Sequence, residues 1–175
     1  MDVAVVGCGR WGSKHLQVLR SLKKAGLVKQ IIAVDYNPDV LAQIKDVDFR
    51  YSTLPERSCD LVILATPSAD HADHSLRLLE KGRHLLVEKP LACSEEEAAQ
   101  VLACAQKHGR ILTVGLLLRF HPAIIHAHCQ LKRGVLGQLL EFNFVRRKTN
   151  CARDGADVME EIGVHGIDLA CHLLG

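Results

Sequence analysis

The fold is decided by Val3-Ala4-Val5-Val6-Gly7-Cys8-Gly9-Arg10-Trp11-Gly12, near the start of a chain of 175 residues. An apolar run typical of a buried strand ends at Gly7, and a helical pattern begins after Gly12. In a G-x-G-x-x-G loop the first glycine permits a tight turn, the second lets the backbone approach a pyrophosphate, and the third lets the helix pack closely on the sheet. The helix start adds free N–H groups that favour phosphate. The stretch therefore predicts a dinucleotide-binding strand, loop and helix.

An acidic residue closes the next expected strand. Residues 30–34 form a second apolar run, and Asp35 follows it 23 positions after Gly12. Its carboxylate would accept hydrogen bonds from ribose hydroxyls but repel a 2′-phosphate, and neither Tyr36 nor Asn37 offers a compensating cation. We therefore predict NAD as the cofactor in preference to NADP. Two alternatives stay open: a plain glycine turn, and an S-adenosylmethionine methyltransferase, which also joins a glycine loop to an acid.

Apolar runs and helical patterns alternate along the first two thirds of the chain. Strands are expected at residues 3–6, 30–34, 60–65, 84–87 and 111–114. Helices are expected at 13–25, at 69–80, after Pro38, and from a capping box at Ser94 and Glu97 to Gly109. Continuous buried strands separated by amphipathic helices predict an α/β protein with a Rossmann-type doubly wound parallel sheet. We place this NAD-binding domain at residues 1–118.

Residues 119–175 follow a different pattern. Helices are expected at 122–132 and 157–174, and alternation predicts a strand at 139–147. Gly163 and Gly166 interrupt the second helix, which suggests that another group approaches its backbone closely. A single strand leaves both of its edges unpaired. This part is therefore predicted to be the incomplete start of an α/β substrate domain.

Chemically active side chains are expected where the strands end. The carboxyl ends of parallel strands line the cofactor crevice, and two motifs fall there, Thr66-Pro67 and Glu88-Lys89-Pro90. Lys89 could hydrogen-bond a substrate hydroxyl and stabilise a developing alkoxide. Taken alone, the triplet is more typical of a surface turn, so it is the place of Lys89 after a strand that favours catalysis.

A second group of polar residues lies on the last expected helix. Glu161, His165, Asp168 and His172 follow one another at intervals of four, three and four, which places them on one stripe. His165 could act as a general acid–base, oriented by Asp168 or Glu161. Spacing alone favours the simpler interpretation of a solvated polar face.

Composition excludes several classes of function. The formal net charge of +2 is too small to predict a nucleic-acid partner. No apolar run is long enough to span a membrane, and the N-terminus lacks the pattern of a signal peptide. The seven cysteines include no C-x-x-C pair, and no histidines stand in a metal-binding motif, so we predict no metal site. A reduced, cytoplasmic protein is expected.

Taken together, the motifs resemble those of the Gfo/Idh/MocA oxidoreductases. Their order is the glycine loop, Ala65-Thr66-Pro67 with His71, Glu88-Lys89-Pro90-Leu91, Gly115 with Arg119-Phe120-His121-Pro122, and Gly163-Val164-His165-Gly166-Ile167-Asp168. The resemblance covers essentially the whole chain. It implies an NAD(P)-dependent dehydrogenase or reductase of sugars, inositols, sugar nucleotides or similar polyols. It also implies an N-terminal Rossmann domain and a C-terminal α/β domain that often mediates homo-oligomerisation.

The resemblance further implies roles for individual residues. Cofactor contacts would come from the glycine loop, the ribose-binding acid and the ends of later strands: Gly7, Gly9, Arg10, Trp11, Gly12, Asp35, Thr66, Pro67, His71, Glu88 and Lys89. Lys89 would also be the active-site lysine, and His165 the acid–base histidine. Glu161 stands where many members have aspartate, which keeps the carboxylate but changes its reach. Members usually continue well beyond this length, so the chain by itself is alternatively a non-catalytic NAD-binding fragment or a redox-sensing module.

Overall fold

The computed structural model describes residues 1–56, 59–147 and 159–175, without the side chains of residues 160 and 161. The chain forms two compact units, Met1–Gly115 and Leu116–Gly175. None of the described helices is long and apolar enough to cross a membrane.

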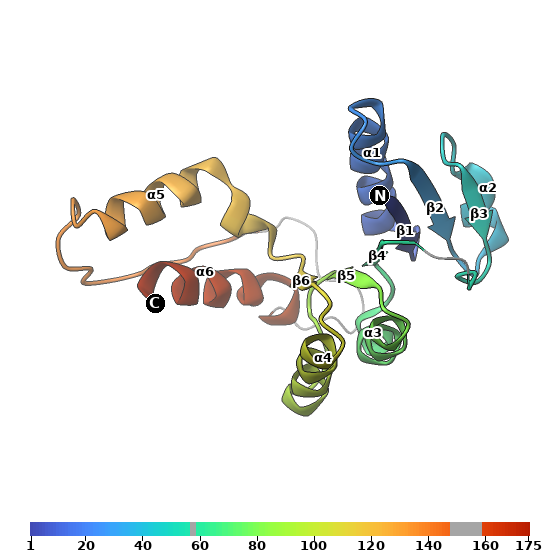
Figure 1. Ribbon diagram of the computed structural model, residues 1–175. Coiled ribbons are helices and arrows are strands. Elements are labelled where there is room, and N and C mark those ends of the chain that lie inside the picture. The colour runs from blue at the N-terminus through green and yellow to red at the C-terminus, as the bar shows by residue number, and fades with distance from the viewer. Residues whose placement is uncertain (57–58, 148–158) are drawn as a thin grey trace. The chain divides into compact units, whose positions relative to one another are not determined.

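The first unit is built on a six-stranded parallel sheet with the strand order β3-β2-β1-β4-β5-β6 (Figure 1). The strands are β1 (Asp2–Val6), β2 (Gln30–Val34), β3 (Phe49–Tyr51), β4 (Leu61–Leu64), β5 (His84–Val87) and β6 (Leu112–Val114). The chain runs outward from β1 to β3, crosses to β4 beside β1, and runs outward again to β6. This is the predicted doubly wound topology. In such sheets ligands bind at the carboxyl ends of the strands that flank the reversal, here β1 and β4.

Helices cover both faces of this sheet. They are α1 (Arg10–Lys24), α2 (Pro38–Gln43), α3 (His71–Glu80), which follows the 3-10 turn η1 (Ser68–Asp70), and α4 (Glu95–Lys107). One buried cluster packs Val3 and Val5 against Leu16 of α1. The other packs Ala4 with Leu79 of α3 and Val101 of α4. Successive residues of β1 thus face opposite clusters, which explains why the strand is apolar throughout.

Local sequence signals place several of these elements correctly. The strands β2 and β5 occupy the predicted residues, and α4 begins at the predicted capping box. There the Glu97 N–H donates to Ser94 Oγ at 3.2 Å, and the Glu97 carboxylate accepts from the Cys93 N–H at 3.1 Å. The sequence does not predict β3, because Arg50 interrupts its short run and leaves no continuous apolar stretch of the kind that marks β6.

The described residues of the second unit contain two α-helices, each preceded by a short helical turn. The 3-10 turn η2 (Leu117–Phe120) precedes α5 (Pro122–Lys132), which occupies the predicted residues. A π-helical turn, η3 (Met159–Gly163), leads into α6 (Val164–Leu174). The last predicted helix is therefore confirmed from residue 159 onward, and its positions 157 and 158 lie outside the described residues.

The predicted strand at residues 139–147 is wrong. These residues have no regular secondary structure, and no other described residue of the second unit forms a strand. An alternating segment becomes a strand only when a neighbouring strand pairs with its backbone. Its Phe144 instead lies on α6, where a Cβ added to Gly166 would be 2.5 Å from the ring. This is the close approach that the helix glycines suggested, whereas a substrate domain at 119–175 stays a prediction.

Candidate cofactor and catalytic site

The glycine loop has one position open to a ligand and two closed by the fold. Gly7 has a φ of +84°, and a Cβ there would lie 2.6 Å from the Ala65 carbonyl oxygen. A Cβ on Gly12 would lie 1.9 Å from the Gly7 carbonyl oxygen, whereas a Cβ on Gly9 would have no atom within 4 Å. Gly7 and Gly12 are therefore required by packing, and Gly9 leaves space where a pyrophosphate could approach the backbone.

The N-terminus of α1 adds positive potential beside this loop. Among the described residues no side chain caps the helix, whose N-cap is Gly9, and its first turn contains no acidic residue. Arg10 and Lys14 lie over the Trp11 ring, at 6.0 and 4.6 Å from its centroid. The free N–H groups of this helix start and the nearby cations favour an anionic ligand such as a pyrophosphate.

Asp35 ties the end of β2 to the glycine loop. Its Oδ2 accepts a hydrogen bond from the Cys8 N–H at 2.8 Å, and its Oδ1 accepts from the Asn37 N–H at 2.9 Å. A carboxylate oxygen can accept more than one hydrogen bond, so both oxygens keep capacity for ribose hydroxyls. The arrangement suits an NAD ribose.

The thiol of Cys8 is held neutral inside the loop. Its Sγ lies 3.5 Å from the Val34 carbonyl oxygen. Burial raises the pKa of Cys8 to about 11; the Val34 contact opposes this increase, and the charge of Asp35 adds to it. A neutral thiol is a poor nucleophile, so Cys8 is a packing residue rather than a reactive one.

Cys8 is accordingly expected to resist alkylation. At pH 8 we expect iodoacetamide to modify exposed Cys93 at least about 100-fold faster, because thiolate forms at Cys8 only as the pH approaches 11. Peptide mass spectrometry after timed quenching measures both rates. In urea the two residues should react alike, and equal rates in the folded protein would contradict the buried, neutral thiol.

Glu88 is buried at the end of β5, directly before the predicted catalytic lysine. It is 6% exposed, and its Oε1 lies 2.7 Å from His15 Nε2 of α1. A Cβ on Gly115 would lie 3.1 Å from Glu88 Oε2, so this glycine leaves room for the carboxylate. The side chain of Glu88 thus contacts the protein itself, and Lys89 follows it, half-buried. His15 belongs to no motif, and no sequence pattern marks it because its partner is 73 positions away.

The end of β4 supplies the remaining predicted cofactor contacts. Thr66 Oγ1 is buried and has no hydrogen-bond partner among the described residues. A bound ligand or a water molecule could supply the missing hydrogen bond. Pro67 follows it and precedes η1. His71, in contrast, is 1% exposed, and both of its ring nitrogens lie near backbone carbonyl oxygens. Its side chain therefore holds the backbone, and no surface of it faces a ligand.

In the second unit Asp168 pairs with an arginine that sequence reasoning missed. Asp168 is 8% exposed, and its Oδ1 accepts from Arg119 Nε at 2.8 Å and from Nη2 at 2.5 Å. The predicted partner was His165, which lies half-buried on the same helix. Asp168 is thus not on a solvated face. The one sequence signal for its pairing with Arg119 was the place of Arg119 among the family motifs. The side chain of Glu161 lies outside the described part of the structure.

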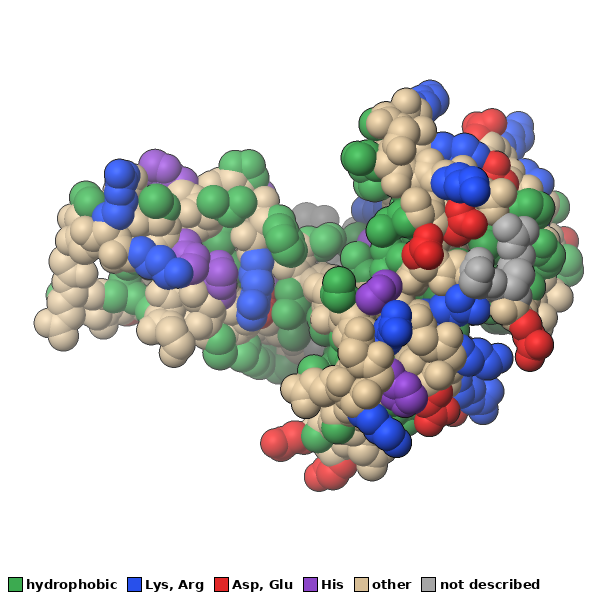
Figure 2. Space-filling model, viewed as in Figure 1, with side chains coloured by type: hydrophobic (Ala, Val, Ile, Leu, Met, Phe, Trp, Pro, Cys, Tyr) green, Lys and Arg blue, Asp and Glu red, His purple; other side chains and the backbone are tan. Residues whose placement is uncertain are grey.

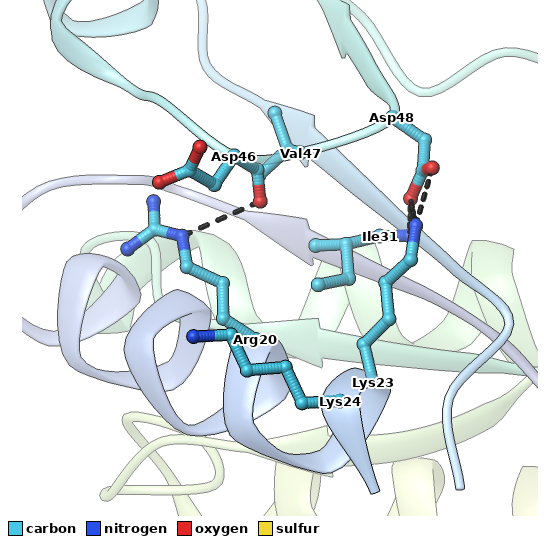
Figure 3. Close-up of a pocket in the computed structure, with 7 residues that line it drawn as sticks. All are labelled: Arg20, Lys23, Lys24, Ile31, Asp46, Val47 and Asp48. Atoms are coloured by element: carbon cyan, nitrogen blue, oxygen red, sulfur yellow. Dashed lines mark hydrogen bonds and ion pairs between the residues drawn. The ribbon is translucent and has the colours of Figure 1, made fainter. Parts of the chain in front are cut away.

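A pocket of about 490 Å³ lies at the other end of α1 (Figure 3). Arg20, Lys23 and Asp48 are among its lining residues. Arg20 donates to the carbonyl oxygens of Lys45 and Asp46, and Lys23 pairs with Asp48. Burial opposes the shift, but Lys23 and the Ile31 N–H lower the pKa of Asp48. The protein itself thus engages these charges, and no predicted site residue lines this pocket.

The arrangement of loop, Asp35 and β5 is that of a known family. Residues 1–116 match a family model described as "Oxidoreductase family, NAD-binding Rossmann fold". The chain belongs to the Gfo/Idh/MocA family. Membership confirms the predicted resemblance, the Rossmann fold and NAD as the cofactor, and it excludes the methyltransferase alternative.

Named relatives of this Gfo/Idh/MocA chain include two inositol dehydrogenases. It is 27% identical to inositol 2-dehydrogenase 2 of Saccharopolyspora erythraea, over 100% of this chain and 54% of that protein. It is also 27% identical to scyllo-inositol 2-dehydrogenase (NAD(+)) of Bacillus subtilis, over 98% of this chain and 53% of that protein. The chain spans about half the length of the curated relatives it matches.

Solved structures agree with the fold. A WlbA dehydrogenase from Chromobacterium violaceum, in complex with NADH and UDP-GlcNAcA, is 27% identical with a TM-score of 0.68, over 78% of this chain and 41% of that one. A scyllo-inositol dehydrogenase from Lactobacillus casei, with bound NAD(H) and scyllo-inositol, has a TM-score of 0.71 at 22% identity, over 78% of this chain and 42% of that one. At that identity the second likeness shows the fold alone.

Proposed function

We propose that the whole protein is an NAD-dependent dehydrogenase or reductase that transfers a hydride between the nicotinamide and a sugar, inositol, sugar nucleotide or similar polyol. The observation that supports this most is the placement of the glycine loop, Asp35 and Lys89 after β1, β2 and β5 of one parallel sheet. Membership of an NAD-binding oxidoreductase family supports it further, as do relatives named inositol dehydrogenases.

In this proposal the first unit binds the cofactor. The glycine loop and the start of α1 hold the pyrophosphate, with Arg10 and Trp11 at its side, and Asp35 accepts from the ribose hydroxyls. Thr66 and Pro67 border the nicotinamide end of the site. NAD, when bound, supplies the hydride acceptor or donor. Glu88 and His71 act indirectly, because their side chains are engaged with the protein.

The proposal gives separate catalytic roles to Lys89 and His165. Lys89 hydrogen-bonds the reacting oxygen of the polyol and stabilises the charge that develops there. His165 exchanges the hydroxyl proton, oriented by Glu161 as the sequence analysis suggested. Asp168 contributes by holding Arg119 through two hydrogen bonds, with its Oδ2 still available for a further donor.

Titration with NADH and NADPH tests the cofactor part of the proposal. Trp11 is the only tryptophan and lies in the glycine loop, so bound NADH should quench its fluorescence. We expect saturable NADH binding and roughly tenfold weaker NADPH binding, because the 2′-phosphate would meet the charge of Asp35. Asp35→Ala is expected to weaken NADH binding about tenfold, since it removes the acceptor for the ribose hydroxyls. It should also reduce the preference for NADH over NADPH, since it removes the charge that repels the 2′-phosphate.

Asp39→Ala is the matched control for this titration. It removes an exposed carboxylate from α2, four residues after Asp35, and should leave both affinities unchanged. A folded sample that binds neither nucleotide would contradict the proposed function. If Asp35→Ala left the preference for NADH over NADPH unchanged, only the role of Asp35 would be contradicted.

A second candidate for this chain is an NAD-binding module without turnover. All the proposed cofactor residues lie in the first unit, whereas His165 lies in the second. Binding and turnover are therefore separable. Saturable NADH binding by a sample that oxidises neither myo-inositol nor scyllo-inositol, while the whole protein does, would favour the module for this chain.

We also propose that the whole protein is a cytoplasmic homo-oligomer. The six described cysteines are all free, which agrees with a reducing compartment. Figure 2 shows hydrophobic side chains at several places on the visible face of the second unit, and Phe120, Leu140 and Val145 are 72%, 89% and 76% exposed. Exposed apolar surface of this kind marks an interface, and sedimentation of the whole protein would show its oligomeric state.

A further inference from the structure

His71 joins two backbone segments that both belong to the proposed site. It is the first residue of α3 and is 1% exposed. Its Nδ1 lies 2.6 Å from the carbonyl oxygen of Pro90, and its Nε2 lies 3.0 Å from that of Thr66. One imidazole ring thus contacts the residue after Lys89 and the first polar residue after β4.

The chemistry of the ring decides which contact matters more. A neutral imidazole has one N–H and can donate to only one of two carbonyl oxygens, whereas the doubly protonated ring can donate to both. The contact of Nδ1, at 2.6 Å, is shorter than that of Nε2, at 3.0 Å, which favours an N–H on Nδ1. With the proton there, the Nδ1–H donates to the Pro90 carbonyl oxygen whether or not Nε2 is also protonated.

The position of the Pro90 carbonyl affects the position of Lys89, the residue before it. At the end of β5 the Glu88 N–H donates to the Leu64 carbonyl oxygen, and the Gly115 N–H donates to the Val87 carbonyl oxygen. Proline has no N–H, so its carbonyl oxygen is the one backbone hydrogen-bonding group that Pro90 offers. Fixing this oxygen fixes the peptide plane after Pro90, so that Lys89 is anchored by β5 on one side and by this peptide on the other.

We propose that His71 is a positioning residue whose Nδ1–H holds the Pro90 carbonyl and thereby sets where the amine of Lys89 lies. The role of Lys89 in this statement rests on the proposed function, whereas the bridge itself does not. A side chain that is 1% exposed has no surface for the cofactor, so its effect reaches the reaction through Lys89.

Three variants separate the two contacts. The amide nitrogen of Asn lies near the position of His Nδ1, so His71→Asn keeps a donor for Pro90. The longer His71→Gln places its amide near Nε2 and keeps a donor for Thr66. His71→Leu removes both. The control is His74→Asn, which makes the same substitution on the same helix. The Nδ1 of His74 has no hydrogen-bond partner among the described residues.

Hydrogen exchange of this chain, read at the amides of Lys89, Leu91 and Ala92, tests the bridge. We expect exchange about three- to tenfold faster in His71→Gln and His71→Leu than in the wild type, because a hydrogen bond is lost. His71→Asn and His74→Asn should stay near the wild-type rate. The ¹⁵N shifts of the His71 ring should show a protonated Nδ1.

Kinetics of the whole protein with NAD⁺ and scyllo-inositol separate positioning from general stability. His71→Gln is expected to lower kcat several-fold more than His71→Asn, with the KM for NAD⁺ unchanged. An unprotonated Nδ1, or equal exchange in the Asn and Gln variants, would overturn the bridge even if His71→Leu does not fold. Failure of the wild type to bind NADH would instead overturn the proposed function and leave the bridge measurable by exchange.

Discussion

Gly12→Ala is expected to abolish measurable NADH binding and to destabilise the first unit. The added Cβ would lie 1.9 Å from the Gly7 carbonyl oxygen and 3.3 Å from Val5 Cγ1. The nearer atom belongs to the backbone, so the loop must open or α1 must move away from the sheet. Because Leu16 and Leu19 anchor α1 in the core, either movement costs packing. We expect the free energy of unfolding to fall by about 2–4 kcal/mol.

Gly9→Ala separates ligand binding from stability in the same loop. No atom lies within 4 Å of a Cβ at Gly9, so its unfolding midpoint in urea should stay near that of the wild type. The methyl group would occupy the space proposed for the pyrophosphate, and NADH binding should weaken at least about tenfold. Circular dichroism in urea and Trp11 fluorescence measure the two effects. Wild-type stability of Gly12→Ala, or wild-type affinity of Gly9→Ala, would contradict this assignment of the loop.

The fold of the first unit could be predicted because its signals are local. Both faces of a parallel sheet are covered, so β2 and β5 are continuous apolar runs, and their ends coincide with turn residues. The Ser94 side chain accepts a hydrogen bond from the Glu97 N–H, and the Glu97 side chain accepts one from the N–H of the residue before Ser94. Both hydrogen bonds lie within a few residues of chain, so the helix start is visible in the sequence without any tertiary contact.

Elements that depend on distant partners were harder to predict. β3 is an edge strand of three residues that is defined by its pairing with β2. Residues 139–147 show the opposite error, because their alternation fits a strand but no described neighbour in the second unit pairs with them. Strand preference describes a side-chain pattern, whereas a strand also requires a hydrogen-bonding neighbour.

In the candidate site, too, the sequence indicated individual residues but not their distant contacts. Motif spacing identified Glu88 and Asp168 as important, but not their contacts, because His15 is 73 positions from Glu88 and Arg119 is 49 from Asp168. A single sequence does not show which residues pair over such distances, although the place of Arg119 among the family motifs marks it as a candidate. It also assigned His71 to the cofactor, whereas burial and two carbonyl neighbours connect it with the backbone around Lys89.

Lys89→Ala is expected to remove nearly all turnover of the whole protein while leaving cofactor binding intact. Lys89 lies two residues after β5 and is half-buried at the carboxyl end of the strands, where the glycine loop and Asp35 also lie. Loss of a donor to the developing alkoxide, together with loss of help in proton transfer, should lower kcat by about 10²- to 10⁴-fold. The affinity for NADH should change little, because the proposed pyrophosphate and ribose contacts come from the residues after β1 and β2.

Lys89→Met and Lys107→Ala complete this test. Methionine keeps the length and apolar stem of the side chain without the amine, so Lys89→Met should lose as much activity as Lys89→Ala. Lys107 is an exposed lysine in the last turn of α4, and its removal should leave kcat unchanged. Rates are measured with NAD⁺ and myo- or scyllo-inositol, and NADH affinity by Trp11 fluorescence. Near-normal turnover of both Lys89 variants with intact NADH binding would show that the amine does not act on the reacting oxygen, and the catalytic role would then have to come from the second unit.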